Sequence, residues 1–310
     1  MDRRLLDLLI CPACLPAEKP LRATALNEAG GDVLEGGLEC PACNRYYPIV
    51  KGVAVLLPEP KTAELRANDR YESPAVIASY LWSHYGDLFG DPEATDAYVR
   101  WADLIDRVSG PALDTGCAVG RLTFEMGRHS ELVIGIDRSL SFVQLARRLK
   151  QEGRLAVRLP LEGRLTEPKA IVLPSGWRRE CCEFLVADAQ SLPFPRGTFN
   201  VSSSLNMVDK LPRPRRHLAE VNRVAAPTGA QLLFADPFSW SAAVAPSKEW
   251  LGGTTRGSFA GGGRENIRRF LESQLSPPWR VTRAAAIWWK LRSHRNHFEL
   301  IRSETLLAVR

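Results

Sequence analysis

The chain contains 310 residues, of which 45% are hydrophobic and 25% are charged, and its formal net charge at neutral pH is +6. This length accommodates one large domain and one small domain. No apolar run reaches the roughly 18 residues that cross a bilayer, which excludes an ordinary membrane-spanning helix.

The N-terminal residues contain two acidic side chains and show no cleavage site of a signal peptide, so we expect a cytoplasmic protein. In that compartment the seven cysteines are expected to be free or to bind metal. The charge is uneven, because residues 1–60 carry −2 and the remainder carries +8. A basic chain is compatible with nucleic-acid binding. Two other interpretations are a solvated basic face and pairing of Arg292 or Arg295 with a substrate carboxylate.

Four cysteines near the N-terminus stand in two identical Cys-Pro-Ala-Cys segments, Cys11–Cys14 and Cys40–Cys43. Two such segments supply four thiolates for one tetrahedral ion. We therefore predict a structural zinc bound by Cys11, Cys14, Cys40 and Cys43; the alternative is a site that has lost its metal. Four thiolates leave no open coordination position for catalysis. Because about 60 residues bury little core, the metal is expected to supply folding energy.

The sequence around these cysteines, residues 5–12 and 43–57, resembles the small zinc-ribbon protein that activates tRNA, rRNA and protein methyltransferases as a separate subunit. The resemblance spans most of residues 1–58 and implies that such a module is fused in cis. We expect a zinc-ribbon domain over residues 1–60, with a linker that begins at Pro58–Lys61.

Residues 61–109 are expected to form a linker and a helical cap region. Helical patterns cover Ser73–Phe89 and Asp96–Val108. The first of them contains Tyr80, His84 and Tyr85, which either pack in the core or line an active site. Tyr85 is included among the catalytic candidates below.

Residues 114–121 read Asp-Thr-Gly-Cys-Ala-Val-Gly-Arg. An apolar lead-in, Pro111–Leu113, ends at the acid, a glycine turn follows, and a helical segment covers Leu122–Arg128. This pattern predicts the first strand–turn–helix of an open α/β sheet with a ligand at the carboxyl ends of its strands. The expected fold over residues 110–310 is Rossmann-like, with helices on both faces of the sheet. The dinucleotide fingerprint G-x-G-x-x-G is absent, which disfavours an NAD-dependent oxidoreductase.

Further buried strands are predicted at 131–137, 182–187, 199–205 and 230–236. They end at polar residues, which parallel pairing brings to one edge of the sheet. Asp137 stands where a carboxylate is expected to bind ribose hydroxyls. Its alternative role is to cap the helix predicted at Ser141–Lys150.

The D-x-G-x-A-x-G loop resembles the first motif of class I S-adenosylmethionine (SAM) methyltransferases. The resemblance implies a SAM site in which Asp188 and Ala189 flank the adenine ring. Cys117 is expected to pack there as a small hydrophobic residue. The predicted cofactor-binding residues are Asp114, Gly116, Cys117, Ala118, Gly120, Arg121, Asp137, Arg138, Asp188, Ala189 and Asn206.

Residues 116–125 look like the methyltransferase domain of ovothiol synthases, which N-methylates the imidazole of 4-mercaptohistidine. The similarity covers roughly residues 78–310, and the segments that carry it are 84–86, 161–163, 206–211, 236–240, 250–253 and the C-terminal strand pair at 291–310. The sulfoxide synthase half of those enzymes has no counterpart here, which implies the methylation step alone. The chain departs from the family in its zinc ribbon and in Asp236–Trp240, so a related imidazole, amine or thiol stays open as the acceptor. An acceptor that carries a carboxylate is expected.

Methyl transfer from a sulfonium depends mainly on positioning, and a neutral imidazole already offers a lone pair. We therefore expect no catalytic triad. The candidates that orient the acceptor are Asn206, Asp209, Asp236, Trp240 and Tyr85. The alternative for the polar residues is loop capping, and for Trp240 and Trp250 it is core packing. His217 lies on an amphipathic helical pattern and is expected to be structural.

Two other functions remain open. An rRNA or tRNA methyltransferase with a zinc recognition module would fit the basic chain, although the ribbon is acidic and no Asn-Pro-Pro-Tyr motif follows the fourth strand. A SAM-binding activator without catalytic activity is the second. The sequence leaves the oligomeric state open.

Overall fold

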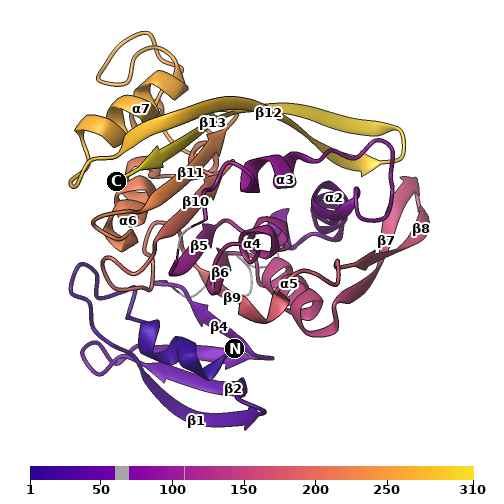
Figure 1. Ribbon diagram of the computed structural model, residues 1–310, viewed down its shortest axis with the longest axis horizontal. Helices are drawn as coiled ribbons and strands as arrows, with labels where there is room; N and C mark the ends of the chain where they lie inside the picture. The colour runs from indigo at the N-terminus through magenta and orange to yellow at the C-terminus, as the bar shows by residue number, and fades with distance from the viewer. Residues whose placement is uncertain (60–69, 108) are drawn as a thin grey trace.

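The computed structural model describes residues 1–59, 70–107 and 109–310. Within them the strands form an eleven-stranded sheet and a separate two-stranded hairpin (Figure 1). The order of the large sheet is β1-β2-β3-β4-β9-β6-β5-β10-β11-β13-β12. Residue 108, the last of the second predicted helical stretch, and residues 60 and 61 of the predicted linker lie outside the described residues.

Five parallel strands form the centre of the sheet, in the order β9-β6-β5-β10-β11. Their bounds are Pro111–Thr115 for β5, Leu132–Asp137 for β6, Cys182–Ala187 for β9, Val201–Leu205 for β10 and Gln231–Asp236 for β11. These strands confirm the five predicted from apolar runs. All of their carboxyl ends lie at one edge of the sheet.

The N-terminal residues form an antiparallel ribbon that continues into this sheet. Its strands are β1 (Arg22–Ala29), β2 (Asp32–Glu39), β3 (Tyr46–Val50) and β4 (Val53–Leu56), preceded by a 3-10 helix at Arg3–Leu8. Strand β4 pairs in parallel with β9, with Val55 opposite Val186 and Leu56 opposite Ala187. The ribbon therefore covers what would otherwise be the edge of the parallel sheet.

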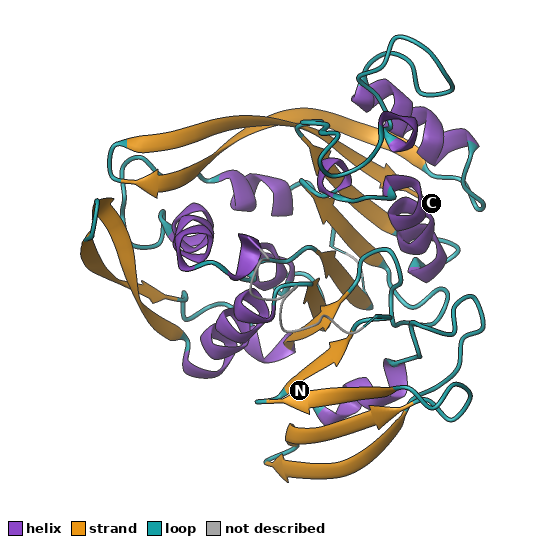
Figure 2. Cartoon of the chain, turned by 180° about the vertical axis from the view of Figure 1, so that it is seen from behind, coloured by secondary structure: helices purple, strands orange, loops and turns teal. Residues whose placement is uncertain are grey.

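Consecutive residues of the central strands belong to two different apolar clusters, as expected for side chains that alternate between the faces of a sheet. Leu113, Ile134 and Leu185 pack with the ribbon core and with the helices α6 (Pro214–Val224) and α7 (Gly263–Ser273). Ala112, Val133 and Phe184 pack with the helices on the other face. These are α2 (Pro74–Tyr85), α3 (Ala97–Ala102), α4 (Arg121–Met126) and α5 (Leu140–Glu152) (Figure 2). The predicted Rossmann-like architecture is confirmed.

Two long antiparallel strands close the fold. β12 (Arg280–His294) pairs with β13 (His297–Val309), which pairs in turn with β11. β12 extends over α2 and α3 (Figure 1), and its Trp289 belongs to the same apolar cluster as Trp82 and Trp101. A second hairpin, β7 (Arg154–Glu162) with β8 (Leu165–Val172), is inserted between α5 and β9.

Helix α2 begins where the sequence predicts, because Ser73 accepts a hydrogen bond from the backbone N–H of Val76 and Pro74 occupies the first turn. Helix α3 is shorter than the predicted stretch and ends at Ala102. Among the described residues, no helix is long and apolar enough to cross a membrane.

Candidate functional site

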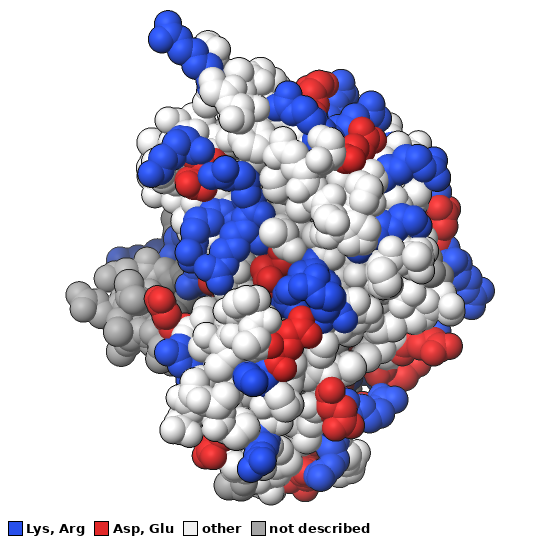
Figure 3. Space-filling model, turned by 90° about the vertical axis from the view of Figure 1, so that its left-hand side faces the viewer, with Lys and Arg blue, Asp and Glu red and all other residues white. Residues whose placement is uncertain are grey.

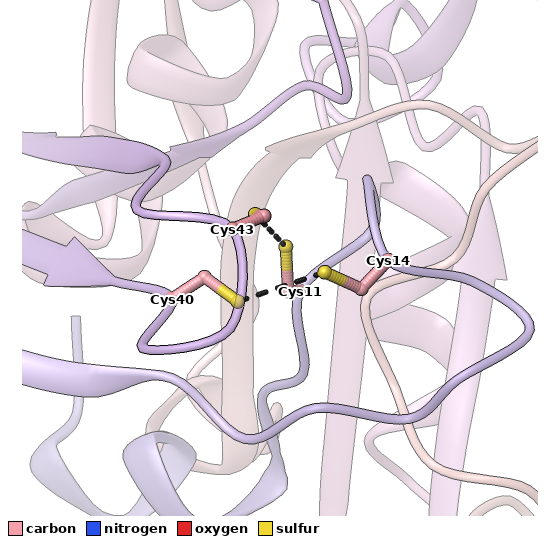
Figure 4. A group of neighbouring side chains, drawn as sticks. All are labelled: Cys11, Cys14, Cys40 and Cys43. Atoms are coloured by element: carbon pink, nitrogen blue, oxygen red, sulfur yellow. Dashed lines mark hydrogen bonds between the residues drawn. The ribbon is translucent and has the colours of Figure 1, made fainter.

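The four N-terminal cysteines converge on one point (Figure 4). Their sulfur atoms all lie within 4.8 Å of one another, and the Cys11–Cys43 and Cys14–Cys40 pairs are each separated by 3.7 Å. Zn–S bonds of about 2.3 Å in a tetrahedron place sulfurs about 3.8 Å apart. The donor set and the spacing thus fit a structural zinc. The hydroxyl of Tyr47 lies 3.1 Å from the Cys11 sulfur, where it can donate a hydrogen bond to a thiolate that binds the metal.

The principal cavity has a volume of about 380 Å³ and lies at the carboxyl ends of β5, β6, β9 and β10. Its volume falls within the usual range of small-molecule sites. The predicted cofactor residues that line it are Asp114, Gly116, Cys117, Ala118, Asp137, Arg138, Ala189 and Asn206.

The glycine loop reaches the cavity through its backbone. Gly116 has a φ of +70°, and a Cβ at this position would lie 2.1 Å from the sulfur of Met207. The N–H groups of Gly116 and Cys117 both donate to the carbonyl of Ile136, at 2.8 and 2.9 Å. These two hydrogen bonds tie the loop to β6. The positive φ and the neighbouring Met207 sulfur leave little space for any residue other than glycine at position 116.

Asp137 ends β6 and its carboxylate is at the cavity wall. It accepts hydrogen bonds from the backbone N–H of Ala118 at 3.0 Å and of Ser139 at 2.8 Å. Asp137 therefore connects the glycine loop with the start of α5. It lines the cavity, as predicted for a ligand-binding residue, and it also lies at the start of the helix, as predicted for a capping residue.

Asp114 has a supporting position beneath the loop. Its oxygens accept hydrogen bonds from the hydroxyls of Thr123 at 2.7 Å and Ser203 at 2.6 Å. Complete burial raises the pKa of this carboxyl to about 6, although both hydroxyls oppose the shift.

The end of β9 is organised by a buried histidine. His217 is fully buried, with Nδ1 3.0 Å from the carbonyl oxygen of Ala189 and Nε2 2.8 Å from the hydroxyl of Ser204. Burial lowers the pKa of His217, so the ring is neutral and one nitrogen donates while the other accepts. Asp188 itself does not line the cavity, and its carboxylate lies 3.8 Å from the guanidinium of Arg138.

Besides Asp188, two predicted cofactor residues, Gly120 and Arg121, lie outside the cavity wall. Gly120 has a φ of +88° and begins α4. Arg121 is buried beneath the loop, where it forms ion pairs with Asp87 at 2.7 Å and Glu125 at 3.0 Å.

Aromatic side chains form a further part of the cavity wall, named here the aromatic wall. They come from the segment before α2, from α2 and α3, from α5 and from β12, and they are Tyr71, Tyr80, His84, Tyr98, Phe142 and Trp289. Rings contact one another along this wall, for example Tyr80 with Phe142 at 5.0 Å and His84 with Tyr98 at 4.2 Å between centroids. The sequence predicts Tyr80 and His84 as possible lining residues of the active site, but it does not point to the other four.

Asn206 follows β10 in a left-handed conformation with φ +56° and lines the cavity. Its Oδ1 accepts a hydrogen bond from the hydroxyl of Ser303 at 2.6 Å, and that hydroxyl accepts from the indole N–H of Trp289 at 2.9 Å. The hydroxyl thus accepts from the indole and donates its own proton to the amide oxygen of Asn206. The amide N–H₂ of Asn206 consequently points away from Ser303.

The other acceptor candidates lie outside the cavity wall. Asp236 accepts from the backbone N–H groups of Val208 and Phe238, and Asp209 accepts from that of Ser239. Burial raises the pKa of both carboxyls, and their proximity raises that of Asp236 further. These contacts correspond to the loop-capping alternative.

The remaining candidates pack elsewhere. Trp240 stacks on Trp250 at 6.2 Å between centroids, and the hydroxyl of Tyr85 donates to the carbonyl of Val119 at 2.7 Å. Arg292 is buried with Asp91 and Glu167, at 3.3 and 3.0 Å, and Arg295 lies 3.7 Å from Glu167. Among the described residues, the Lys and Arg side chains that line the cavity are Arg138 and Lys210, and the sequence pattern predicts only Arg138.

Two family models match the chain. Residues 113–233 match a methyltransferase domain, and residues 2–52 match the Trm112p-like proteins. The first match covers the glycine loop and the central strands β6 to β10, and the second covers the four cysteines. Among curated proteins, no sequence matches this chain.

Solved structures with a similar arrangement are distant in sequence. A SAM-dependent methyltransferase from Methanosarcina mazei is 17% identical, with a TM-score of 0.45, and the alignment covers 69% of this chain and 98% of that one. A complex between the Haloferax volcanii Trm112 methyltransferase activator and a methyltransferase gives 14% identity and a TM-score of 0.46, with 77% of this chain and 98% of that one covered.

Proposed function

We propose that the protein, which combines a SAM-dependent methyltransferase domain with a Trm112-like zinc module, transfers a methyl group from SAM to a nitrogen of a small molecule. The proposed acceptor is a histidine-derived imidazole that carries a carboxylate, such as 4-mercaptohistidine. The observation that carries the proposal is the aromatic wall, which turns the carboxyl ends of the strands into a cavity of small-molecule size.

The cofactor half of the site fits a nucleoside. Gly116–Ala118 present backbone to the cavity, Asp137 provides a carboxylate, and Ala187 and Ala189 provide small side chains at the end of β9. SAM supplies an electrophilic methyl group on a sulfonium. The task of the protein is to hold this group and the acceptor in line and to exclude water.

The acceptor half of the site is built by elements outside the region matched by the methyltransferase model. Tyr80 and Tyr98 come from α2 and α3, and Trp289 comes from β12. Flat aromatic walls favour a planar ring, and they also favour the partial positive charge that develops on an imidazole during methylation.

Arg138 and Lys210 support an acidic group on the acceptor. Both line the cavity, and their side chains are 47% and 40% exposed at its mouth. Lys210 also forms an ion pair with the buried Asp209 at 2.7 Å. A carboxylate in the cavity would lie near these two cations, whereas Arg292 does not line the cavity and is buried with Asp91 and Glu167.

The test is a methyl-transfer assay with labelled SAM and a panel of histidine, 4-mercaptohistidine, histamine and histidinamide, read by mass spectrometry. We expect transfer to a ring nitrogen, and weaker transfer when the carboxylate is missing. Asp137→Ala should lower SAM affinity at least tenfold. If SAM binds tightly but no imidazole is methylated, the proposed acceptor class is wrong.

A second candidate is methylation of RNA. The Trm112p-like match and the Lys and Arg side chains that gather on the face shown in Figure 3 favour it. Such an enzyme would bind RNA with an affinity that falls steeply with salt. Incorporation of methyl groups into RNA, with none into the imidazole panel, would decide for this candidate.

A further inference from the structure

The imidazole of His84 lines the cavity without a hydrogen-bond partner for either ring nitrogen in the described part of the chain. The residue is only 4% exposed, and Nδ1 is fully enclosed. Nε2 is therefore the ring nitrogen that can reach a ligand in the cavity.

An unpaired buried imidazole is unusual, because buried polar groups in native proteins are almost always hydrogen-bonded. His217 in the same protein follows the rule, with partners on both nitrogens. Both histidines are buried, but only His217 has partners among the described residues. Nε2 of His84, in the wall of the cavity, thus lacks a partner that a ligand can supply.

The neighbours of His84 hold the ring in place from several elements. Tyr98 on α3 lies 4.2 Å away between centroids, and Tyr80 on the same helix lies 5.9 Å away. Arg121 on α4 donates to the backbone carbonyl of His84 at 2.7 Å. Burial, together with this guanidinium, lowers the pKa of His84 well below its ordinary value. The ring is consequently neutral at physiological pH and retains a lone pair.

We propose that Nε2 of His84 accepts a hydrogen bond from the ring N–H of the methyl acceptor and thereby turns the other ring nitrogen toward the methyl donor. This inference rests on the proposed function and narrows its substrate class. The acceptor must be an azole with an N–H on one side and a nitrogen lone pair on the other.

The hydrogen bond gains strength along the reaction. The lone pair of the acceptor nitrogen forms the new N–C bond, the C–S bond breaks, and its electron pair stays on sulfur. The methylated ring is then cationic, and its remaining N–H is more acidic than before. This N–H stays hydrogen-bonded to Nε2 of His84 while the ring is bound. The proton is lost to water when the product leaves the cavity, which yields the neutral N-methyl azole. Because the bond to His84 is strongest when the ring carries positive charge, it favours the transition state over the bound substrate.

The experiment compares H84F with H84Q and H217F in the full-length protein, with 4-mercaptohistidine and histidine as acceptors. H84F removes both ring nitrogens at similar volume, whereas the amide oxygen of H84Q can still accept a hydrogen bond. We expect H84F to lower kcat about 10- to 100-fold, which is the effect of losing one hydrogen bond to a charged group. H84Q should recover most of this loss, and S-adenosylhomocysteine affinity should be unchanged in both variants.

Stability provides the readout that separates ligand contact from a structural role. H84F removes an unsatisfied polar atom, so its melting temperature should equal or exceed that of the wild type. H217F leaves the Ser204 hydroxyl and the Ala189 carbonyl without their hydrogen bonds to the histidine, so this variant should melt at a lower temperature. An acceptor methylated beforehand on one ring nitrogen lacks the N–H, so for it H84F should cost little.

The outcomes separate the two proposals. Failure of the wild type to methylate any imidazole overturns the proposed function. Full activity of H84F on an imidazole that the wild type methylates overturns the role of His84 alone. So does a loss of S-adenosylhomocysteine affinity as large as the loss in kcat, because His84 would then contact the cofactor.

Discussion

The hydroxyl of Ser303 donates to the amide oxygen of Asn206 at 2.6 Å, across nearly a hundred residues of sequence. The indole of Trp289 donates to the same hydroxyl, so the three groups form a relay that runs from Trp289 through Ser303 to Asn206. As a result, the last two strands of the chain orient the one predicted acceptor-binding amide that lies at the cavity wall.

Ser303→Ala should uncouple this orientation. We expect about a tenfold loss of kcat with S-adenosylhomocysteine affinity unchanged, and a loss of about 1–3 kcal/mol in the free energy of unfolding, because the Trp289 N–H is left buried without a partner. Thr305→Val is the matched control, since Thr305 on the same strand accepts from Trp101 at 3.1 Å, and Trp101 does not line the cavity. It should lose similar stability and keep its activity. Equal activity of the two variants would refute a role of the relay in turnover.

Zinc removal should weaken the SAM site as well as the ribbon. β4 pairs with β9 at Ala187, directly before Asp188 and Ala189. We expect one zinc per chain in the wild type and none in Cys40→Ser, with a lower melting temperature and weaker S-adenosylhomocysteine binding. Metal analysis and calorimetry measure these effects. Cys181 lies near Gly127 and is not part of the four-cysteine cluster. The control variant Cys181→Ala should therefore retain one zinc per chain. A zinc-free Cys40→Ser protein with wild-type stability would contradict a structural metal.

The pKa of Asp114 predicts a pH dependence of stability. In the folded protein this pKa is raised from 3.8 to about 6, so the folded state binds more protons than the unfolded state between these values. The free energy of unfolding should therefore fall as the pH rises through this window, by about 3 kcal/mol for a shift of about two units. Chemical denaturation at pH 4 and pH 7 should show this fall in the wild type relative to Asp114→Asn. A constant difference between the two proteins would rule out the raised pKa.

The contact between ribbon and sheet should depend on Arg147. Its side chain is 4% exposed on α5 and pairs with Asp32 at the start of β2. Asp32→Ala leaves both the Arg147 guanidinium and the buried N-terminal ammonium of Met1 without their shared carboxylate. Such a loss typically costs about 3–5 kcal/mol, and less here because Asp32 is 30% exposed. Glu152→Ala breaks the exposed pair with Arg148 on the same helix and should cost less than about 1 kcal/mol. Urea titrations of the two variants provide the comparison, and equal midpoints would contradict the assignment.

The central strands were predictable because each is a short apolar run that ends at a polar residue. That pattern identified Asp137 and Asn206, which are at the cavity wall. The same pattern selected Asp236, yet the backbone turns at Phe238 and brings two N–H groups onto this carboxylate. Sequence does not show whether a polar residue after a strand faces a ligand or its own turn, because the direction depends on one or two backbone angles.

Most residues of the aromatic wall could not be predicted from the sequence. Tyr98 and Trp289 stand almost two hundred residues apart and meet only because β12 passes over α3. The pairing of β4 with β9 was missed for the same reason, since the two strands carry no mutual signal in the sequence. Local patterns predict elements, whereas contacts between remote elements require the topology.

The parallel pairing of β4 with β9 has a consequence for how the protein behaves on dilution. If the ribbon were a separate chain, the share of assembled complex would fall with concentration, and β9 would expose an unpaired strand edge whenever the ribbon dissociated. Here one polypeptide carries both sides of the pairing. The ratio of the two parts is therefore set at one to one by translation, and assembly is an intramolecular event that no change in expression level can unbalance.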